Sequence, residues 1–78
     1  MAEQRGVLMP NLRAWRRDRG LTQGELAQVS GVAISTITRA ENAQPVSLRN
    51  ARKLAAALKL EYRQLLHEEP DVKAEPAA

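Results

Sequence analysis

The chain has 78 residues, enough for one small domain, and its formal net charge is +3. Its hydrophobic residues, 44% of the total, include many alanines and only two aromatic residues, Trp15 and Tyr62, which favours close-packed helices over a β-sandwich. The lack of cysteine excludes disulfides and thiolate metal sites, and no apolar run reaches the roughly 18 residues of a membrane span, so we expect a cytoplasmic protein without metal or cofactor.

Charge is distributed unevenly along the chain. The residues from His67 onward carry a net charge of about −3. Because the whole chain carries +3, the residues before His67 carry about +6. A basic body suits a polyanionic partner, although a basic surface can also serve solubility alone. We expect residues 1–7 to form an N-terminal arm in which Arg5 could reach a phosphate, residues 8–67 to form the folded domain, and residues 68–78 to form a disordered acidic tail.

The first helix is expected over residues 10–19. Pro10 suits a first helical position, and Leu8, Leu12 and Trp15 follow the helical period. Gly20 ends the run. Because Trp15 shares the stripe of Leu12, we expect it in the core, where its indole N–H needs an acceptor.

Residues 21–41, LTQGELAQVSGVAISTITRAE, predict two short helices joined by a glycine turn. Thr22 and Glu25 form a capping box at the start of the first helix, and Gly31 can take the left-handed conformation that ends it. The second helix, over residues 33–41, is expected to leave a polar face free. Behind that face lies an apolar wedge of Leu26, Val32, Ile37 and Ala40. This is the pattern of a helix-turn-helix.

Two further helices follow in an all-α chain. Ser47 is expected to cap the fourth helix, and the fifth is expected over residues 61–67. The inward positions of the fourth helix keep the helical period and are Leu48, Ala51, Leu54, Ala55 and Leu58. The apolar residues of the fifth helix either complete the core or form a dimer surface, and they are Tyr62, Leu65 and Leu66.

Four stretches together, WRRDRGLTQGELA, SGV, STITRAEN and SLRNARKLAAAL, resemble the phage-repressor and Cro-type (XRE-like) helix-turn-helix family from about Leu12 to Leu66. The resemblance implies a compact five-helix, lambda-repressor-like DNA-binding domain. It also implies an ion pair between Arg16 and Glu41 that clamps the first helix onto the third, and a planar guanidinium can pair bidentately with such a carboxylate.

The sequence departs from the family where relatives usually have glycine, at Ala43 and Lys59. In the loop after the third helix we therefore expect Asn42, and not Ala43, to adopt any left-handed conformation. At Lys59 we expect either a slightly strained turn or a helix that ends later.

The DNA contacts are expected from two groups of residues. Base contacts are assigned to the free face of the third helix, to Ala33, Ile34, Ser35, Thr38 and Arg39. Among these, Arg39 suits guanine O6 and N7, while Ile34 either meets a thymine methyl or packs beside Ile37. The resemblance and the helix ends place contacts to the DNA backbone at Thr22, Gln23, Asn42, Gln44 and Ser47, and Arg49 is expected to meet phosphate as well.

The sequence thus predicts a small nucleoid-associated transcriptional regulator, foremost a repressor, that binds specific double-stranded DNA. One reading helix covers few base pairs, so a homodimer on a palindromic operator is expected. A single histidine and the lack of a glycine-rich phosphate loop give no catalytic constellation, so no enzyme activity is expected. Two alternatives stay open: a DNA-binding antitoxin that masks a toxin, and a protein adaptor that no longer binds DNA.

Overall fold

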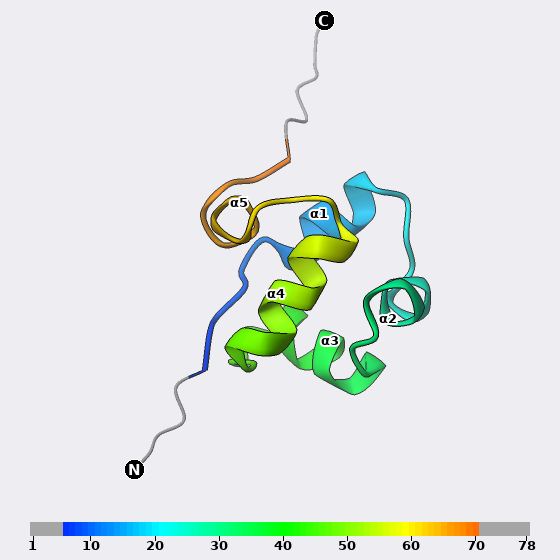
Figure 1. The fold of residues 1–78 in the computed structure, drawn as a ribbon, viewed down its shortest axis with the longest axis horizontal. Helices are drawn as coiled ribbons and strands as arrows, with labels where there is room; N and C mark the ends of the chain where they lie inside the picture. The colour runs from blue at the N-terminus through cyan, green and yellow to red at the C-terminus, as the bar shows by residue number, and fades with distance from the viewer. Residues whose placement is uncertain (1–5, 71–78) are drawn as a thin grey trace, which may run out of the picture.

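Five helices make up the part of the chain that the computed structural model describes, residues 6–70 (Figure 1). They are α1 (Leu12–Asp18), α2 (Gln23–Ser30), α3 (Ile34–Glu41), α4 (Leu48–Ala57) and α5 (Tyr62–His67). Helix α2 packs against α3 and α4, α5 packs against α4 and α1, and α1 also contacts α3. The expected all-α, five-helix fold is confirmed. Within residues 6–70, extended pairing is limited to one antiparallel bridge between Val7 and Val46.

The helix ends follow the capping signals in the sequence. The Thr22 hydroxyl accepts the Glu25 N–H at 3.0 Å, and the Glu25 carboxylate accepts the Thr22 N–H at 2.9 Å, which completes the capping box of α2. Gly31 ends this helix with φ 75°, in the left-handed region. At α4, the Ser47 hydroxyl accepts the Asn50 N–H at 3.1 Å. These contacts satisfy amides that a helix end would otherwise leave unpaired.

The beginning of α1 differs from the expectation. Pro10 and Asn11 form a turn, and the helix begins at Leu12. Leu8, expected on the buried stripe, is 56% exposed, whereas Met9 is 1% exposed and belongs to the core. The reason is that Leu8 lies on the extended segment next to the Val7 bridge, where neighbouring side chains point to opposite sides. The helical period therefore does not extend back to residue 8.

The core lies between all five helices. The four residues of the expected wedge are buried, each at 3% exposure or less. Leu48 was expected to point inward and is instead 43% exposed, because Val46, two residues earlier, occupies the core at the start of α4. In α5, Leu65 is fully buried, and Tyr62 and Leu66 pack against the core while partly exposed.

Two non-glycine residues adopt left-handed backbone conformations, Ala43 with φ 63° and Lys59 with φ 60°. The expectation that Asn42 would be the left-handed residue is wrong. Asn42 has φ −102° and still closes α3, because its N–H bonds to the Thr38 and Arg39 carbonyls. The chain reverses one residue later, so that the Gln44 N–H reaches the Arg39 carbonyl at 3.0 Å. At Lys59 the expected strained turn is present.

The segment after α5 folds back onto α1. The Glu68 carbonyl accepts hydrogen bonds from the Trp15 indole at 2.8 Å and from the Asn11 amide at 2.9 Å, and Pro70 is buried. The expected domain boundary at residue 68 therefore falls inside a packed segment. Residues 71–78 of the expected tail and residues 1–5 of the expected arm, including Arg5, lie outside the described residues. Of the helices between residues 6 and 70, none has the length and apolar character needed to cross a bilayer.

Candidate nucleic-acid interface

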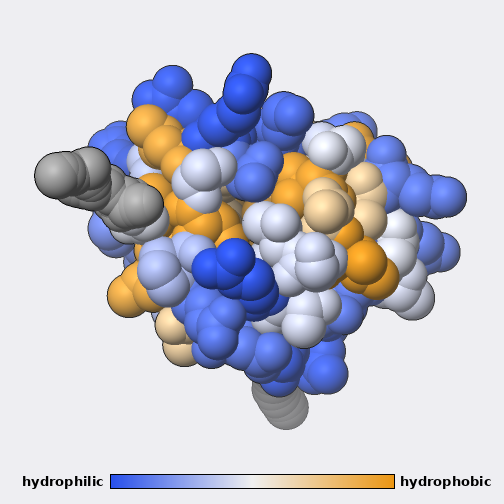
Figure 2. Space-filling model, turned by 90° about the horizontal axis from the view of Figure 1, so that it is seen from below, coloured by the Kyte–Doolittle hydropathy of each residue, from blue (hydrophilic) through white to orange (hydrophobic). Residues whose placement is uncertain are grey.

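The outer side of α3 is uncovered by the rest of residues 6–70. Ala33, Ser35 and Arg39 are exposed, Ile34 is 49% exposed, and Thr38 is half-buried. On the inner side Ile37 is fully buried, whereas Ile34 keeps about half of its surface exposed. Figure 2, which views the molecule from the end where α3 lies in Figure 1, shows apolar areas beside strongly hydrophilic groups on this surface. The surface can therefore offer both hydrogen bonds and methyl contacts.

Two of the five expected base-contact residues already have hydrogen-bond partners within the domain. The Thr38 hydroxyl donates to the Ile34 carbonyl at 3.0 Å, with the Gln23 Oε1 atom at 3.3 Å as a second acceptor. The Arg39 guanidinium donates through Nε to Gln44 Oε1 at 3.2 Å and through Nη2 to the Pro45 carbonyl at 3.4 Å. Arg39 keeps free N–H groups because a guanidinium carries five.

A buried carboxylate fixes the inner side of α3. The Glu41 side chain is 0% exposed, and Arg16 binds it bidentately, with Nε at 2.6 Å from Oε2 and Nη2 at 3.0 Å from Oε1. Gln23 Nε2 and Arg13 Nε donate to the same Oε1 at 3.0 and 3.2 Å. Arg16 also donates to the Leu21 carbonyl at 2.9 Å. The pairing of Arg16 with Glu41 thus joins α1, the start of α2 and the end of α3.

Opposing effects act on the pKa of Glu41. Burial raises the pKa of this carboxyl, whereas the hydrogen bonds from Arg16, Gln23 and Arg13 and the charge of Arg16 lower it, and the lowering effects prevail. The hydrogen bond with Glu41 in turn raises the pKa of Arg16 against the opposing effect of burial. Both groups are therefore charged at neutral pH.

The residues expected at the DNA backbone occupy different environments. Thr22, Asn42, Gln44, Ser47 and Arg49 are exposed, with Thr22 and Ser47 at the first turns of α2 and α4. Gln23 is half-buried, and its amide lies between Glu41 and Thr38. The Gln23 side chain is thus engaged in positioning α3, and its terminal atoms do not point freely to solvent.

An open groove brings some of these residues together. Arg39 and Ser47 line it with Pro45, and so do two residues that sequence reasoning missed, Thr36 and Asn50. Thr36 lies three residues before Arg39, and Asn50 lies three residues after Ser47, so each shares a helix face with an expected site residue. That spacing is the signal that could have identified them.

The fold and the free face of α3 define the class of helix-turn-helix domains. A family model described as helix-turn-helix matches residues 12–65. The chain therefore belongs to the XRE-type helix-turn-helix family, whose phage-repressor and Cro members the sequence resembles, and it is a DNA-binding transcriptional regulator.

Several solved structures are similar to this chain, and three of them are the following. The restriction-modification controller protein C.AhdI from Aeromonas hydrophila is 45% identical, with a TM-score of 0.67 over 70% of this chain and 85% of its own. A hypothetical transcription factor, NHTF from Neisseria, is 34% identical, with a TM-score of 0.70 over 85% and 77%. The SinR protein/SinI protein complex contains a chain that is 25% identical, with a TM-score of 0.71 over 88% and 69%. A comparison with curated proteins found no match.

Proposed function

We propose that residues 33–41 enter the major groove of a specific DNA site and read bases through the outer face of α3. The observation that carries this proposal is that the face is exposed while its opposite side is fixed by the core and by the Arg16–Glu41 pair. A rigid helix with one free face is the element that a major groove can accept. A protein adaptor that has lost DNA binding would use this face for a protein partner instead, and it would show no salt-dependent binding to duplex DNA.

The test measures relative affinities over a library of duplex sites. Replacing Arg39 by alanine should remove about 1–3 kcal/mol of discrimination at one guanine position. Replacing Arg49 by alanine should instead weaken binding to all duplex sequences alike, because a phosphate contact carries no sequence information. It should also reduce the dependence of affinity on salt concentration, because one charge contact with phosphate is lost. The assignment of Arg39 is wrong if the relative affinities of the Arg39→Ala variant match those of the wild type.

Contacts to the DNA backbone are proposed at the two capped helix starts. The exposed Thr22 and Ser47 lie where unpaired amides of α2 and α4 favour a phosphate oxygen. Asn42 and Arg49, which precede and follow Ser47 in the chain, are exposed and extend this set. Gln23 would contribute through its backbone or by positioning α3, since its side-chain amide is already bonded.

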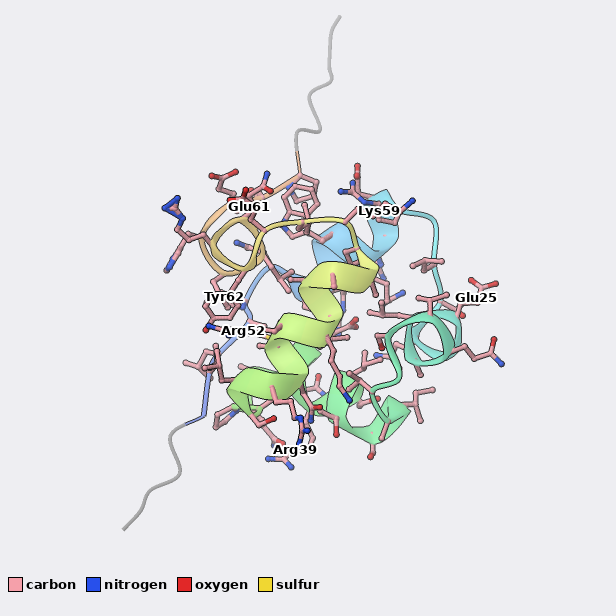
Figure 3. The ribbon with its side chains drawn as sticks, viewed as in Figure 1. Glu25, Arg39, Arg52, Lys59, Glu61 and Tyr62 are labelled. Atoms are coloured by element: carbon pink, nitrogen blue, oxygen red, sulfur yellow. The ribbon has the colours of Figure 1, made fainter. Side chains whose placement is uncertain are left out.

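We further propose that the chain acts as a homodimeric repressor on a palindromic operator, without catalysis and in the nucleoid of the cytoplasm. Of the residues considered for a dimer surface, Leu65 belongs to the core, and the Arg52 guanidinium lies 5.7 Å from the ring centroid of Tyr62 (Figure 3). Leu66 and the free edge of Tyr62 remain as candidates. Sedimentation equilibrium and selection of bound duplexes test this: two half-sites about 34 Å apart are expected.

A protein partner is the second candidate function. One similar structure is a complex between two proteins, SinR and SinI. An antitoxin or another regulated DNA-binding protein would combine both roles on this fold. Affinity purification of the wild type and of a variant defective in DNA binding distinguishes the cases, since a direct protein partner should be retained by both.

A further inference from the structure

The Arg39 guanidinium is held along one of its edges. Its Nε and Nη2 atoms donate to Gln44 Oε1 at 3.2 Å and to the Pro45 carbonyl at 3.4 Å. These two nitrogens form the side edge of the planar group. The N–H groups that remain belong to Nη1 and to the second position of Nη2, at the end of the fork. That end can still form two parallel hydrogen bonds.

The loop that supplies the two acceptors is itself fixed. The Gln44 N–H bonds to the Arg39 carbonyl at 3.0 Å, and Val7 and Val46 exchange two backbone hydrogen bonds of 2.7 and 3.0 Å. Val46 is 6% exposed, and Gly6 packs so closely on the Pro45 ring that a β-carbon there would overlap it. The Pro45 carbonyl and the backbone of Gln44 therefore keep their position relative to α3, and the Gln44 side chain reaches Arg39 from this fixed backbone. Figure 3 shows Arg39 beside the N-terminal end of α4, at the end of the molecule where α3 lies.

We propose that Gln44 is a positioning residue for base reading, and that with the Pro45 carbonyl it directs the end of the Arg39 fork toward guanine O6 and N7. This inference rests on the proposed function. A long side chain that is ordered before binding loses less rotamer freedom in the complex, so its bidentate contact discriminates more strongly. Gln44 thus acts through Arg39, and not through the phosphate contact that the sequence suggested.

The two roles of Gln44 differ in what they do to sequence preference. A lost phosphate contact weakens binding to every duplex by the same factor and reduces the salt dependence. A lost positioning contact weakens only the duplexes that offer the guanine acceptors. The guanine analogue 7-deazaguanine, which lacks the N7 acceptor, separates the two because it removes one of the two bonds without changing the phosphates.

The experiment first selects a preferred duplex from a random pool with the full chain. Dissociation constants are then measured for that duplex and for versions with 7-deazaguanine at each guanine in turn. The wild type is expected to lose about tenfold in affinity at one guanine, and Arg39→Ala should show no loss there. For Gln44→Ala, the loss of affinity caused by 7-deazaguanine at that guanine should fall from about tenfold to about threefold or less. Its affinity for the 7-deazaguanine duplex should equal that of the wild type.

Two further variants serve as controls. Gln44→Glu keeps an acceptor for Arg39 and adds a negative charge, so it should weaken all duplexes and yet retain the tenfold ratio. Gln28→Ala, which changes an exposed glutamine on α2, should alter neither quantity. The proposal is overturned if Gln44→Ala retains the full ratio or weakens all duplexes alike. A wild-type chain that binds no duplex would instead overturn the proposed function itself.

Discussion

Ala43 and Lys59 adopt a backbone conformation that favours glycine, with φ near 60° at both positions. In this region the β-carbon of an L-residue approaches the following carbonyl oxygen, which costs roughly 1–2 kcal/mol. The sequence indicates the strain at Lys59, where relatives have glycine. In the loop after α3 the sequence predicts the strain at the wrong residue. Side-chain preference favours Asn42 over Ala43, but it does not reveal that the last helical hydrogen bonds of α3 come from the Asn42 N–H.

Glycine at either strained position should therefore stabilise the protein. For Ala43→Gly and for Lys59→Gly we expect the free energy of unfolding to rise by about 0.5–1 kcal/mol, less than the full strain because glycine also gains freedom in the unfolded chain. Urea titration measures the effect. The matched control is Ala56→Gly on the exposed side of α4, where the same change should cost about 1 kcal/mol. If Ala43→Gly and Ala56→Gly change the free energy of unfolding in the same direction, residue 43 is not strained.

Ile34 presents an apolar side chain at the N-terminal end of α3 and is 49% exposed. If it meets a thymine methyl group, replacing that thymine by uracil should weaken binding roughly fourfold. This factor corresponds to the loss of about 0.8 kcal/mol, the contribution of one buried methyl-sized group. Ile34→Ala should be insensitive to the same replacement. Titrations of the two proteins with thymine and uracil duplexes give the answer, and equal sensitivity in both would assign the methyl contact to another residue.

Among the elements, α1 and α3 are joined by a buried ion pair and not by apolar packing alone. The Glu41 side chain is 0% exposed and accepts bonds from Arg16, Gln23 and Arg13. Sequence reasoning reached the Arg16–Glu41 pair through the family resemblance. It missed Gln23, because whether the first turn of α2 approaches the end of α3 depends on the angle between helices, which helical periodicity does not contain. It also missed Arg13, which lies three residues before Arg16 on the same face of α1 and could have been found from that spacing.

Removing the carboxylate should destabilise the domain strongly. Glu41→Ala leaves Arg16 without its partner at a site where it is 11% exposed, and we expect a loss of about 3–5 kcal/mol. For a domain of this size that loss corresponds to a fall in Tm of roughly 12 °C or more. Thermal denaturation followed by circular dichroism tests it. Arg13→Ala, at a position 50% exposed, should cost less than about 1 kcal/mol, and a comparable loss there would show that burial is not what matters.

The same carboxylate makes stability depend on pH. Because the folded protein lowers the pKa of Glu41 below its ordinary value of 4.5, the stabilisation is complete above that value and is lost as the pH falls through the folded pKa. The Tm of the wild type and of Glu41→Gln should therefore differ most near neutral pH and converge in acid. A difference in Tm that stays constant from about pH 7 to about pH 3 would show that the carboxylate charge contributes nothing.

At the scale of the whole molecule, helix number and order follow from the sequence, because caps, glycine turns and the apolar period all indicate the same elements. The exceptions depend on contacts between distant parts of the chain. Leu8 and Leu48 keep the helical period but lie beside the Val7–Val46 bridge, a contact between segments far apart in the chain. Glu68 and Pro70 have the composition of a tail, yet a backbone carbonyl can be bound whatever its side chain, and composition does not reveal that.

The outer face of α3 shows the same division. Which residues of α3 face outward follows from its period, and the exposed Ser35 and Arg39 agree with that reasoning. Which outward residues keep free donors does not follow, because Thr38 and Arg39 are bonded to groups on α2 and in the 42–47 loop. Periodicity assigns a residue to a face, and only the tertiary contacts assign its hydrogen bonds.

The single tryptophan of the chain lies where it can report on the segment after α5. Trp15 is 7% exposed, the Arg19 guanidinium lies 5.1 Å from its ring centroid, and its indole nitrogen donates to the Glu68 carbonyl. If residues 68–70 leave α1, water reaches the indole, and its fluorescence emission shifts to longer wavelength. Arg16, the next residue, holds Glu41 at the end of α3. An unlabelled sample therefore carries its own optical probe, one residue away from the contact that joins α1 to the end of α3.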